Sequence, residues 1–135
     1  MSTPAMQATS GEFGVRRIRQ IAITVQDVER AVRFYRDILG MTFLFQAPPG
    51  LAFFDCGGVR LMLSRPEGSD TASGASVLYY LVDDIQQAHA TLTARGAQFV
   101  DTPHMVARMP DHDLWITIGL DSEGNHFGLM SEVRP

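Results

Sequence analysis

Hydrophobic and polar residues alternate over residues 18–25, and a helical pattern follows directly. Ile21, Ile23 and Val25 share one face of this stretch, which predicts a strand with one buried side. Asp27 stands at the expected N-cap of the helix, where its carboxylate accepts hydrogen bonds from free backbone amides. Apolar residues then recur at helical spacing up to Gly40, which suits the end of a helix: Val28, Ala31, Val32, Tyr35, Ile38 and Leu39.

Three short strands are expected after this helix, at 41–47, 51–55 and 59–64. The turn formers Pro48-Pro49-Gly50 and Gly57-Gly58 separate them. The first part of the chain therefore predicts a βαβββ unit. The next residues, 66–75, are rich in turn formers and poor in apolar side chains, and they predict a polar linker.

The same pattern returns in the second half of the chain. The stretch Ile21–Ala31 is echoed 57 residues later by Leu78–Ala88, and Asp55–Leu63 is echoed 66 residues later by Asp121–Leu129. A repeat of this length indicates one supersecondary unit used twice. The second copy predicts a strand at 77–82, a helix capped by Asp84 and ending at Gly96, strands near 97–101, 114–120 and 125–130, and a long irregular loop at 102–113 that the first copy lacks.

Composition limits the classes of partner. A chain of 135 residues has the size of one domain, and no apolar run reaches the roughly 20 residues that span a bilayer. A net charge of −4 argues against nucleic acid and anionic membranes as main partners; Arg16, Arg17 and Arg19 are interpreted as a solvated strand end. The single cysteine, Cys56, excludes an internal disulfide and favours a reducing, cytoplasmic location. Residues 1–15 lack the pattern of a secretory signal and predict a flexible tail.

The doubled signature over about residues 16–132 resembles the vicinal oxygen chelate superfamily, which includes glyoxalase I, bleomycin-resistance proteins, methylmalonyl-CoA epimerase and extradiol dioxygenases. The resemblance implies an α+β fold in which two tandem βαβββ modules form a curved eight-stranded mixed sheet. Helices would cover its convex side, and its concave side would enclose a small-molecule cleft. Module 1 would span about 16–65 and module 2 about 76–132, joined by the linker 66–75. A homodimer is also expected, because members of the superfamily often pair.

Metal-dependent members of this superfamily hold a divalent ion with side chains from the first and last strands of each module. By that resemblance, the four ligand positions fall on Gln20, Met62, Val77 and Gly128. None of these four is a usual ligand of a hard or borderline divalent ion. We therefore expect no metal and no other cofactor at this site.

Alternation along the strands predicts which other side chains face the concave cleft. In the two repeats Arg60 and His126 occupy the same position. A guanidinium beside apolar and aromatic walls suits a small anionic or aromatic ligand. Thr117 is expected on this face, with Leu114, Ile116 and Ile118 toward the helices, and Gly128 is expected to leave space. The predicted ligand-binding residues are Gln20, Arg60, Met62, Tyr79, Trp115 and His126.

Two classes of function remain open. The first is a binding protein that encloses a small molecule without chemistry. The second is a metal-independent or atypical enzyme that transfers a proton, as an isomerase or lyase does, with His126, His104 or Tyr79 as the catalytic candidates. A metal-dependent glyoxalase or dioxygenase is a third hypothesis. His104 and His112 flank the predicted loop, His89 is expected at the edge of the core, and Cys56 is expected to be inert.

Overall fold

The computed structural model describes residues 13–66 and 76–134, so most of the predicted tail and linker lies outside the described residues. Module 1 has the expected βαβββ order. Its elements are β1 (Gln20–Thr24), α1 (Val28–Arg33) continued by a π-helical segment η1 (Phe34–Ile38), β2 (Thr42–Ala47), β3 (Leu51–Cys56) and β4 (Val59–Ser64).

Module 2 repeats this order with one strand divided in two. Its elements are β5 (Tyr79–Leu81), α2 (Ile85–Ala94), β6 (Gln98–Phe99), β7 (His104–Arg108), β8 (Asp113–Leu120) and β9 (His126–Val133). The prediction of an irregular loop at 102–113 is wrong, because β7 occupies much of this segment and pairs with β8. Since β6 also pairs with β8, the two short strands are successive parts of one sheet edge.

Both helices begin as the sequence predicts. The Asp27 carboxylate accepts a hydrogen bond from the Arg30 amide at 3.0 Å, and the Asp84 carboxylate accepts one from the Gln87 amide at 3.1 Å. These bonds satisfy amides that a helix leaves free at its first turn. The repeat therefore preserves the helix start in both modules.

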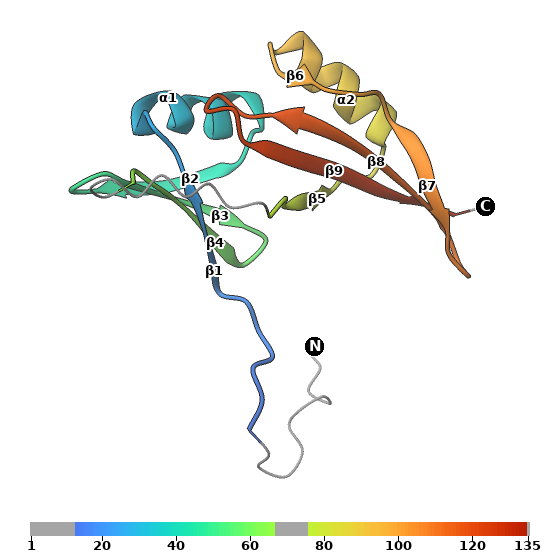
Figure 1. Cartoon of the computed structure of the whole chain (residues 1–135), viewed down its shortest axis with the longest axis horizontal. Helices are drawn as coiled ribbons and strands as arrows, with labels where there is room; N and C mark the ends of the chain where they lie inside the picture. Colours follow the sequence, from blue (N-terminus) through green and yellow to red (C-terminus); the bar gives the residue numbers. More distant parts are fainter. Residues whose placement is uncertain (1–12, 67–75, 135) are drawn as a thin grey trace.

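The predicted α+β class is confirmed, with mixed strand pairing in each module. The strand order is β1-β4-β3-β2 in a four-stranded sheet and β5-β9-β8-β6 in a five-stranded sheet, with β7 also paired to β8. β1 and β5 run parallel to their neighbours β4 and β9. The strands thus form two sheets rather than one continuous ladder. Figure 1 shows them side by side, with both helices on the same side.

One hydrophobic core joins the two modules beneath the helices. Tyr35, Phe54 and Leu63 of module 1 are almost fully buried, and they share a cluster with Phe127 and Leu129 of β9. An aromatic contact crosses between the modules, since the Phe34 and Phe127 rings lie 6.1 Å apart in an edge-on arrangement. The modules consequently pack as halves of one core.

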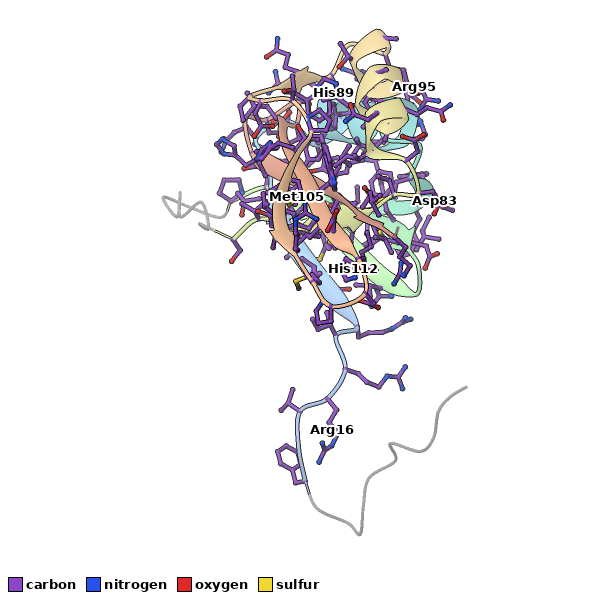
Figure 2. All side chains as sticks on the ribbon, turned by 90° about the vertical axis from the view of Figure 1, so that its right-hand side faces the viewer. Arg16, Asp83, His89, Arg95, Met105 and His112 are labelled. Carbon is purple, nitrogen blue, oxygen red and sulfur yellow. The ribbon has the colours of Figure 1, made fainter. Side chains whose placement is uncertain are left out.

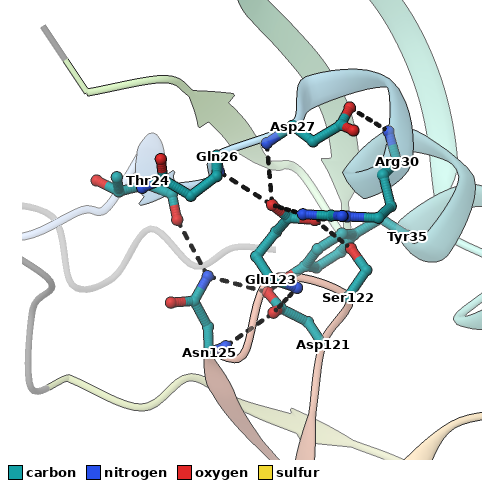
Figure 3. A network of polar contacts seen from close by, with 9 residues as sticks. All are labelled: Thr24, Gln26, Asp27, Arg30, Tyr35, Asp121, Ser122, Glu123 and Asn125. Carbon is teal, nitrogen blue, oxygen red and sulfur yellow. Dashed lines mark hydrogen bonds and ion pairs between the residues drawn. The ribbon is translucent and has the colours of Figure 1, made fainter.

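The turn between β8 and β9 ties module 2 to the start of α1 (Figure 3). The Glu123 carboxylate accepts backbone hydrogen bonds from Gln26 and Asp27 at 3.0 and 2.9 Å. The Arg30 guanidinium donates to both of its oxygens, at 2.7 and 3.0 Å. The Glu123 side chain is 1% exposed. The hydrogen bond from Arg30 leads the causes that lower the pKa of Glu123 to about 2, against the opposing effect of burial.

Two further residues of the same turn complete this network. Asp121 accepts a hydrogen bond from the Tyr35 hydroxyl at 2.7 Å, and its other oxygen accepts from the Glu123 and Asn125 amides. Asn125 donates to the Thr24 carbonyl oxygen at 3.0 Å, at the end of β1. Because these bonds join residues about 90 to 100 positions apart, they fix the position of β1 against module 2.

Within the described residues, no helix has both the length and the apolar character needed to cross a membrane. Residues 13–19 precede β1 and lead away from the body on the side opposite the helices (Figure 1). Phe13 and Val15 in this segment are 92% and 89% exposed.

Candidate functional site

Gln20, Arg60 and Met62 lie together on the face of module 1 that points away from the helices. β1 and β4 pair so that Gln20 is opposite Arg60, and Ala22 is opposite Met62. The Arg60 Nε donates to Gln20 Oε1 at 2.7 Å, and Gln20 Nε2 lies 3.9 Å from Met62 Sδ. The alternation along these strands therefore predicted the face correctly, because Ile21, Ile23 and Leu61 turn toward the core.

Two phenylalanines extend this face, and the sequence reasoning did not name them. Phe53 of β3 is opposite Met62, and Phe45 of β2 is opposite Phe53. The Phe45 and Phe53 rings lie 4.7 Å apart, and the Arg60 guanidinium carbon lies 5.5 Å from the centre of the Phe53 ring. The period-two rule applied to the predicted strand 51–55 would have found Phe53. The result is a guanidinium held over an aromatic surface.

A hollow of about 570 Å³ lies toward the other end of β1 and β4, and of these residues Met62 lines it. Thr24 of β1, Met62 and Ser64 of β4, and Leu51 of β3 contribute to its wall. The remaining wall comes from the β2–β3 turn and from the chain after β4, namely Pro49, Gly50, Arg65 and Pro66. This volume is within the range of small-molecule sites, and its wall mixes hydroxyl, thioether and aliphatic groups.

The corresponding face of module 2 is built differently. Tyr79 is opposite Gly128, and a Cβ atom at position 128 would collide with the Tyr79 ring. The ring therefore covers the glycine backbone, and the space expected at Gly128 is filled. Tyr79 itself remains 46% exposed, and His126 is exposed at the start of β9.

Trp115 and Thr117 lie on the opposite face of β8 from the one predicted. Thr117 is opposite Leu129, a core residue, and Trp115 packs against the same core. Thr117 is fully buried, and its hydroxyl donates to the Asp101 carboxylate at 2.6 Å. Trp115 is therefore not a residue of the face that points away from the helices. Leu114, Ile116 and Ile118 take that face instead, because Ile116 and Ile118 are opposite Met130 and Gly128.

The remaining histidines have local partners. His104 lies on β7, where its Nδ1 is 2.8 Å from the Thr102 carbonyl oxygen. His112, at the β7–β8 hairpin, has Nδ1 2.7 Å from an Asp111 carboxylate oxygen. The His89 and Phe99 rings lie 4.3 Å apart, centre to centre, at a tilt of 41°. Figure 2 shows His89 on α2 and His112 at the hairpin. No hydrogen bond among residues 13–66 and 76–134 joins these histidines to Arg60 or Tyr79.

A second hollow, of about 380 Å³, lies along the seam between the unpaired edges of β1 and β5. Ile21 to Thr24, Val77 and His126 contribute to its wall, as does Tyr80. The Tyr80 hydroxyl is buried and has no hydrogen-bond partner. Burial is the main cause that raises the pKa of Tyr80, so the neutral phenol is the stable form.

Donor chemistry on the two sheets does not suit a divalent ion. Across residues 13–66 and 76–134, no group of three or more His, Cys, Asp or Glu side chains is arranged to hold one. The positions that the resemblance assigns to metal ligands offer an amide at Gln20, a thioether at Met62 and no side chain at Gly128. Imidazole or carboxylate ligands would be expected there.

Comparison with known proteins gives consistent matches. The family model described as Glyoxalase/Bleomycin resistance protein/Dioxygenase superfamily matches residues 17–129. Human mitochondrial methylmalonyl-CoA epimerase is 31% identical over 75 residues, which cover 52% of this chain and 43% of that protein. The chain thus spans less than half the length of this curated relative.

Solved structures show the same fold. A superfamily member from Sphaerobacter thermophilus has a TM-score of 0.72 at 27% identity, covering 87% of this chain and 98% of that one. Lactoylglutathione lyase from Agrobacterium tumefaciens has a TM-score of 0.68 at 22% identity, covering 85% and 92%.

Proposed function

Because the chain belongs to the Glyoxalase/Bleomycin resistance protein/Dioxygenase superfamily, we propose that it binds a small molecule on the concave face of module 1 without a metal ion. The ligand carries an anionic group, such as a carboxylate, next to an apolar or aromatic portion. The observation that carries this proposal is the position of Arg60, held by Gln20 over Phe53 on the same strand face as Met62, which lines the 570 Å³ hollow.

Arg60 supports an anion site because its orientation is fixed while part of its donor set is free. Its Nε is occupied by Gln20, and no contact within the described residues occupies its two terminal nitrogens. Two parallel N–H groups match the geometry of a carboxylate or phosphate. The guanidinium also lies against Phe53, so its position does not depend on the ligand.

The rest of the face supports an apolar portion of the ligand. Phe45 and Phe53 supply flat aromatic surface, and Met62 supplies a side chain that adapts to different shapes. Hydroxyl groups of Thr24 and Ser64 lie at the hollow and are available for orienting hydrogen bonds.

The absence of a metal is proposed from the donors and from the packing at the four ligand positions. Superfamily chemistry that polarises vicinal oxygens requires a bound ion. Here Gln20 is engaged with Arg60, and the Tyr79 ring covers Gly128. We therefore assign no step to a metal. Analysis of protein purified without chelators would contradict this assignment if it found about one equivalent of nickel, zinc, iron or manganese.

An enzyme that transfers a proton without a metal is the second candidate. The similarity to methylmalonyl-CoA epimerase favours it. The polar groups on the concave side that suit such a step are Tyr79 and His126, which lie on β5 and β9. His104 is a weaker candidate, because its Nδ1 already contacts a carbonyl oxygen.

A thermal-shift screen of small carboxylates, phosphates, aromatic acids and acyl thioesters tests the proposal. A ligand at a hundred times its dissociation constant adds about 2.7 kcal/mol to stability, which is several degrees in the midpoint. Arg60→Ala should abolish the response to anionic compounds. Arg36→Ala is the matched control, since Arg36 makes an exposed ion pair with Asp37 on the helix side.

The two candidates separate when a compound found in this screen is incubated with the protein in D₂O. Incorporation of deuterium at an acidic carbon, measured by NMR, supports the enzyme, and binding without exchange supports the binding protein. If Arg60→Ala and Arg36→Ala respond alike to every anionic hit, the anion site is wrong.

We also propose a homodimer in a cytoplasmic setting. The family relationship and the exposed apolar side chain of Leu81, which lies outside the Arg60 site, support the dimer. The single cysteine supports the compartment.

A further inference from the structure

A third hollow, also of about 570 Å³, lies between the start of α2 and the adjoining ends of β2 and β3. We call it the acidic groove. Its apolar wall includes Leu39, Met41 and Leu92, and three carboxylate residues border it, namely Asp55, Asp83 and Asp84. The groove is a separate hollow from the one beside Met62, but it adjoins the Arg60 site, because Asp55 pairs with Arg60 across β3 and β4.

The acidic residues of this groove form no ion pair within the described residues, although Arg60 is the cross-strand neighbour of Asp55. No ion pair within 4.0 Å involves Asp55, Asp83 or Asp84 in the described part of the chain. Arg95 follows α2, but its guanidinium donates to the Ile38 carbonyl oxygen at 2.9 Å. An apolar hollow bordered by unpaired carboxylates suits a segment that is both apolar and basic.

Residues 13–19, the N-terminal arm, have this chemistry. Phe13, Val15 and Ile18 are 92%, 89% and 67% exposed, and Arg16 and Arg17 lie between them in the sequence. Figures 1 and 2 show the arm leading away from the body, with the Arg16 side chain far from both sheets. Apolar side chains exposed to this degree on a basic segment indicate a contact surface.

The arm begins beside the groove of its own chain. The Arg19 guanidinium donates to the Gly58 carbonyl oxygen at 3.0 Å, and the Arg60 amide donates to the Arg19 carbonyl oxygen at 2.8 Å. Gly58 belongs to the turn that follows Cys56, a groove residue. Since the start of the arm and the groove are neighbours, one two-fold contact between two copies engages both arms and both grooves.

We propose that the N-terminal arm of one copy docks in the acidic groove of a second copy, and that the exchange is reciprocal. The arginines of the arm face the carboxylates, and its apolar side chains cover the apolar wall. This assigns a specific surface to the homodimer proposed above and rests on that dimer, but it does not depend on the ligand of the Arg60 site.

Cysteine cross-linking tests this contact directly, because Cys56 lines the groove and is the single cysteine of the chain. In a V15C variant under mild oxidation, we expect a disulfide between position 15 of one copy and Cys56 of the other. Non-reducing electrophoresis followed by peptide mapping identifies it. Val133→Cys is the matched control, since Val133 is exposed at the end of β9, and it should not link to Cys56. Adding Cys56→Ser to V15C should remove the link.

Charge reversal gives an independent measurement. R16E/R17E and D55K/D83K should each weaken the dimer at least tenfold in sedimentation analysis, and their combination should restore affinity to within threefold of the parent protein. Asp84 is left intact because it caps α2. Thermal midpoints close to that of the parent show that each variant is folded.

A dimer that persists in both charge variants, with no link between positions 15 and 56, overturns arm exchange while leaving a homodimer in place. A link found only within monomers overturns it too, because the arm then docks in its own groove. A protein that is monomeric at all concentrations overturns both the exchange and the homodimer.

Discussion

Each module places a hairpin turn toward the start of the other module's helix. We call each such contact between a turn and a helix start a junction, and the two junctions differ. At α1, the turn 121–125 closes the junction with the buried Glu123 carboxylate. At α2, the two-residue turn of Gly57 and Gly58 leaves the acidic groove open. Both helices nevertheless have the same aspartate cap and the same type of first turn. The difference therefore comes from the side chains and from the length of the turn.

Strand pairing shows how the turns diverged. Cys56 pairs with Val59, which leaves two residues in the turn of module 1, whereas Leu120 pairs with His126, which leaves five residues, 121–125, in the turn of module 2. Asp55 thus stays on its strand, while Asp121 enters the turn and is buried. The closed junction uses Arg30, Tyr35, Glu123 and Asn125, and the repeat positions hold Gln87, Leu92, Gly57 and Val59. The duplication kept the backbone plan, but only one junction retains polar groups that hold the modules together.

The largest effect is expected from removing the charge at the closed junction. Glu123→Gln should lower the free energy of unfolding by about 2–3 kcal/mol, because it breaks the two-oxygen contact with Arg30 and weakens acceptance from the helix amides. Arg30 is half exposed, which keeps the loss below that of a fully buried pair. Urea titration measures it. Glu29→Gln, an exposed change in the same first turn, should cost less than about 0.5 kcal/mol. Equal losses would show that Glu123 does not hold the junction.

Lowering the pH should remove the contribution of the Glu123 carboxylate to the free energy of unfolding. The pKa of Glu123 in the folded chain is lowered to about 2 from an ordinary value near 4.5, with the Arg30 hydrogen bond as the leading cause. A lowered pKa means that the folded state binds fewer protons, so the stabilisation is present above about pH 4.5 and is lost as pH falls toward 2. The stability difference between the parent and Glu123→Gln should shrink by about 2 kcal/mol over this range. A constant difference would contradict this assignment.

Two tyrosines provide a smaller and sharper contrast. Tyr35→Phe should destabilise by about 1–2 kcal/mol, because the Asp121 carboxylate loses a buried hydrogen bond. Tyr80→Phe should be neutral or slightly stabilising, since its buried hydroxyl has no partner to lose. Thermal unfolding measures both changes in stability. The two substitutions are comparable, because each removes the hydroxyl oxygen from a buried phenol. Reversal of this order would mean that Tyr80 has a partner outside the protein, such as water or a ligand in the seam.

Local patterns explain why much of the fold was predictable. β1 alternates between aliphatic and polar residues, and the Asp27 and Asp84 caps mark both helix starts, so faces and boundaries follow from nearby residues. In β8 the alternation of residues does not show which face is buried, because both of its faces are apolar. Thr117 is buried with its hydroxyl donating to Asp101, and no local pattern reveals that partner. β7 was missed because turn formers surround it and its pairing with β8 is a tertiary contact.

The candidate site shows the same division. Gln20, Arg60 and Met62 were brought together correctly, because they occupy alternate positions on paired neighbouring strands. The filled space at Gly128 was not predicted, since it depends on how the Tyr79 ring lies across the strand pair. Glu123 was also missed as a junction residue. The sequence signal for Glu123 was its position in the repeat, where module 1 has Gly57. That difference could be interpreted only with the lengths of both turns.

The smallest effect is expected from copying the closed junction into the open one. In G57E/Q87R, the new glutamate and arginine take the repeat positions of Glu123 and Arg30. A double-mutant cycle should give a coupling within about 0.5 kcal/mol of zero, whereas Glu123 and Arg30 should couple by about 1–2 kcal/mol. The shorter turn does not bring position 57 to the helix amides, and Gly57 has a φ of 63°, which disfavours any side chain. A coupling above 1 kcal/mol would show that side chains alone separate the two junctions. A coupling near zero would show that copying the two side chains does not close the junction, as the two-residue turn and the backbone at Gly57 predict.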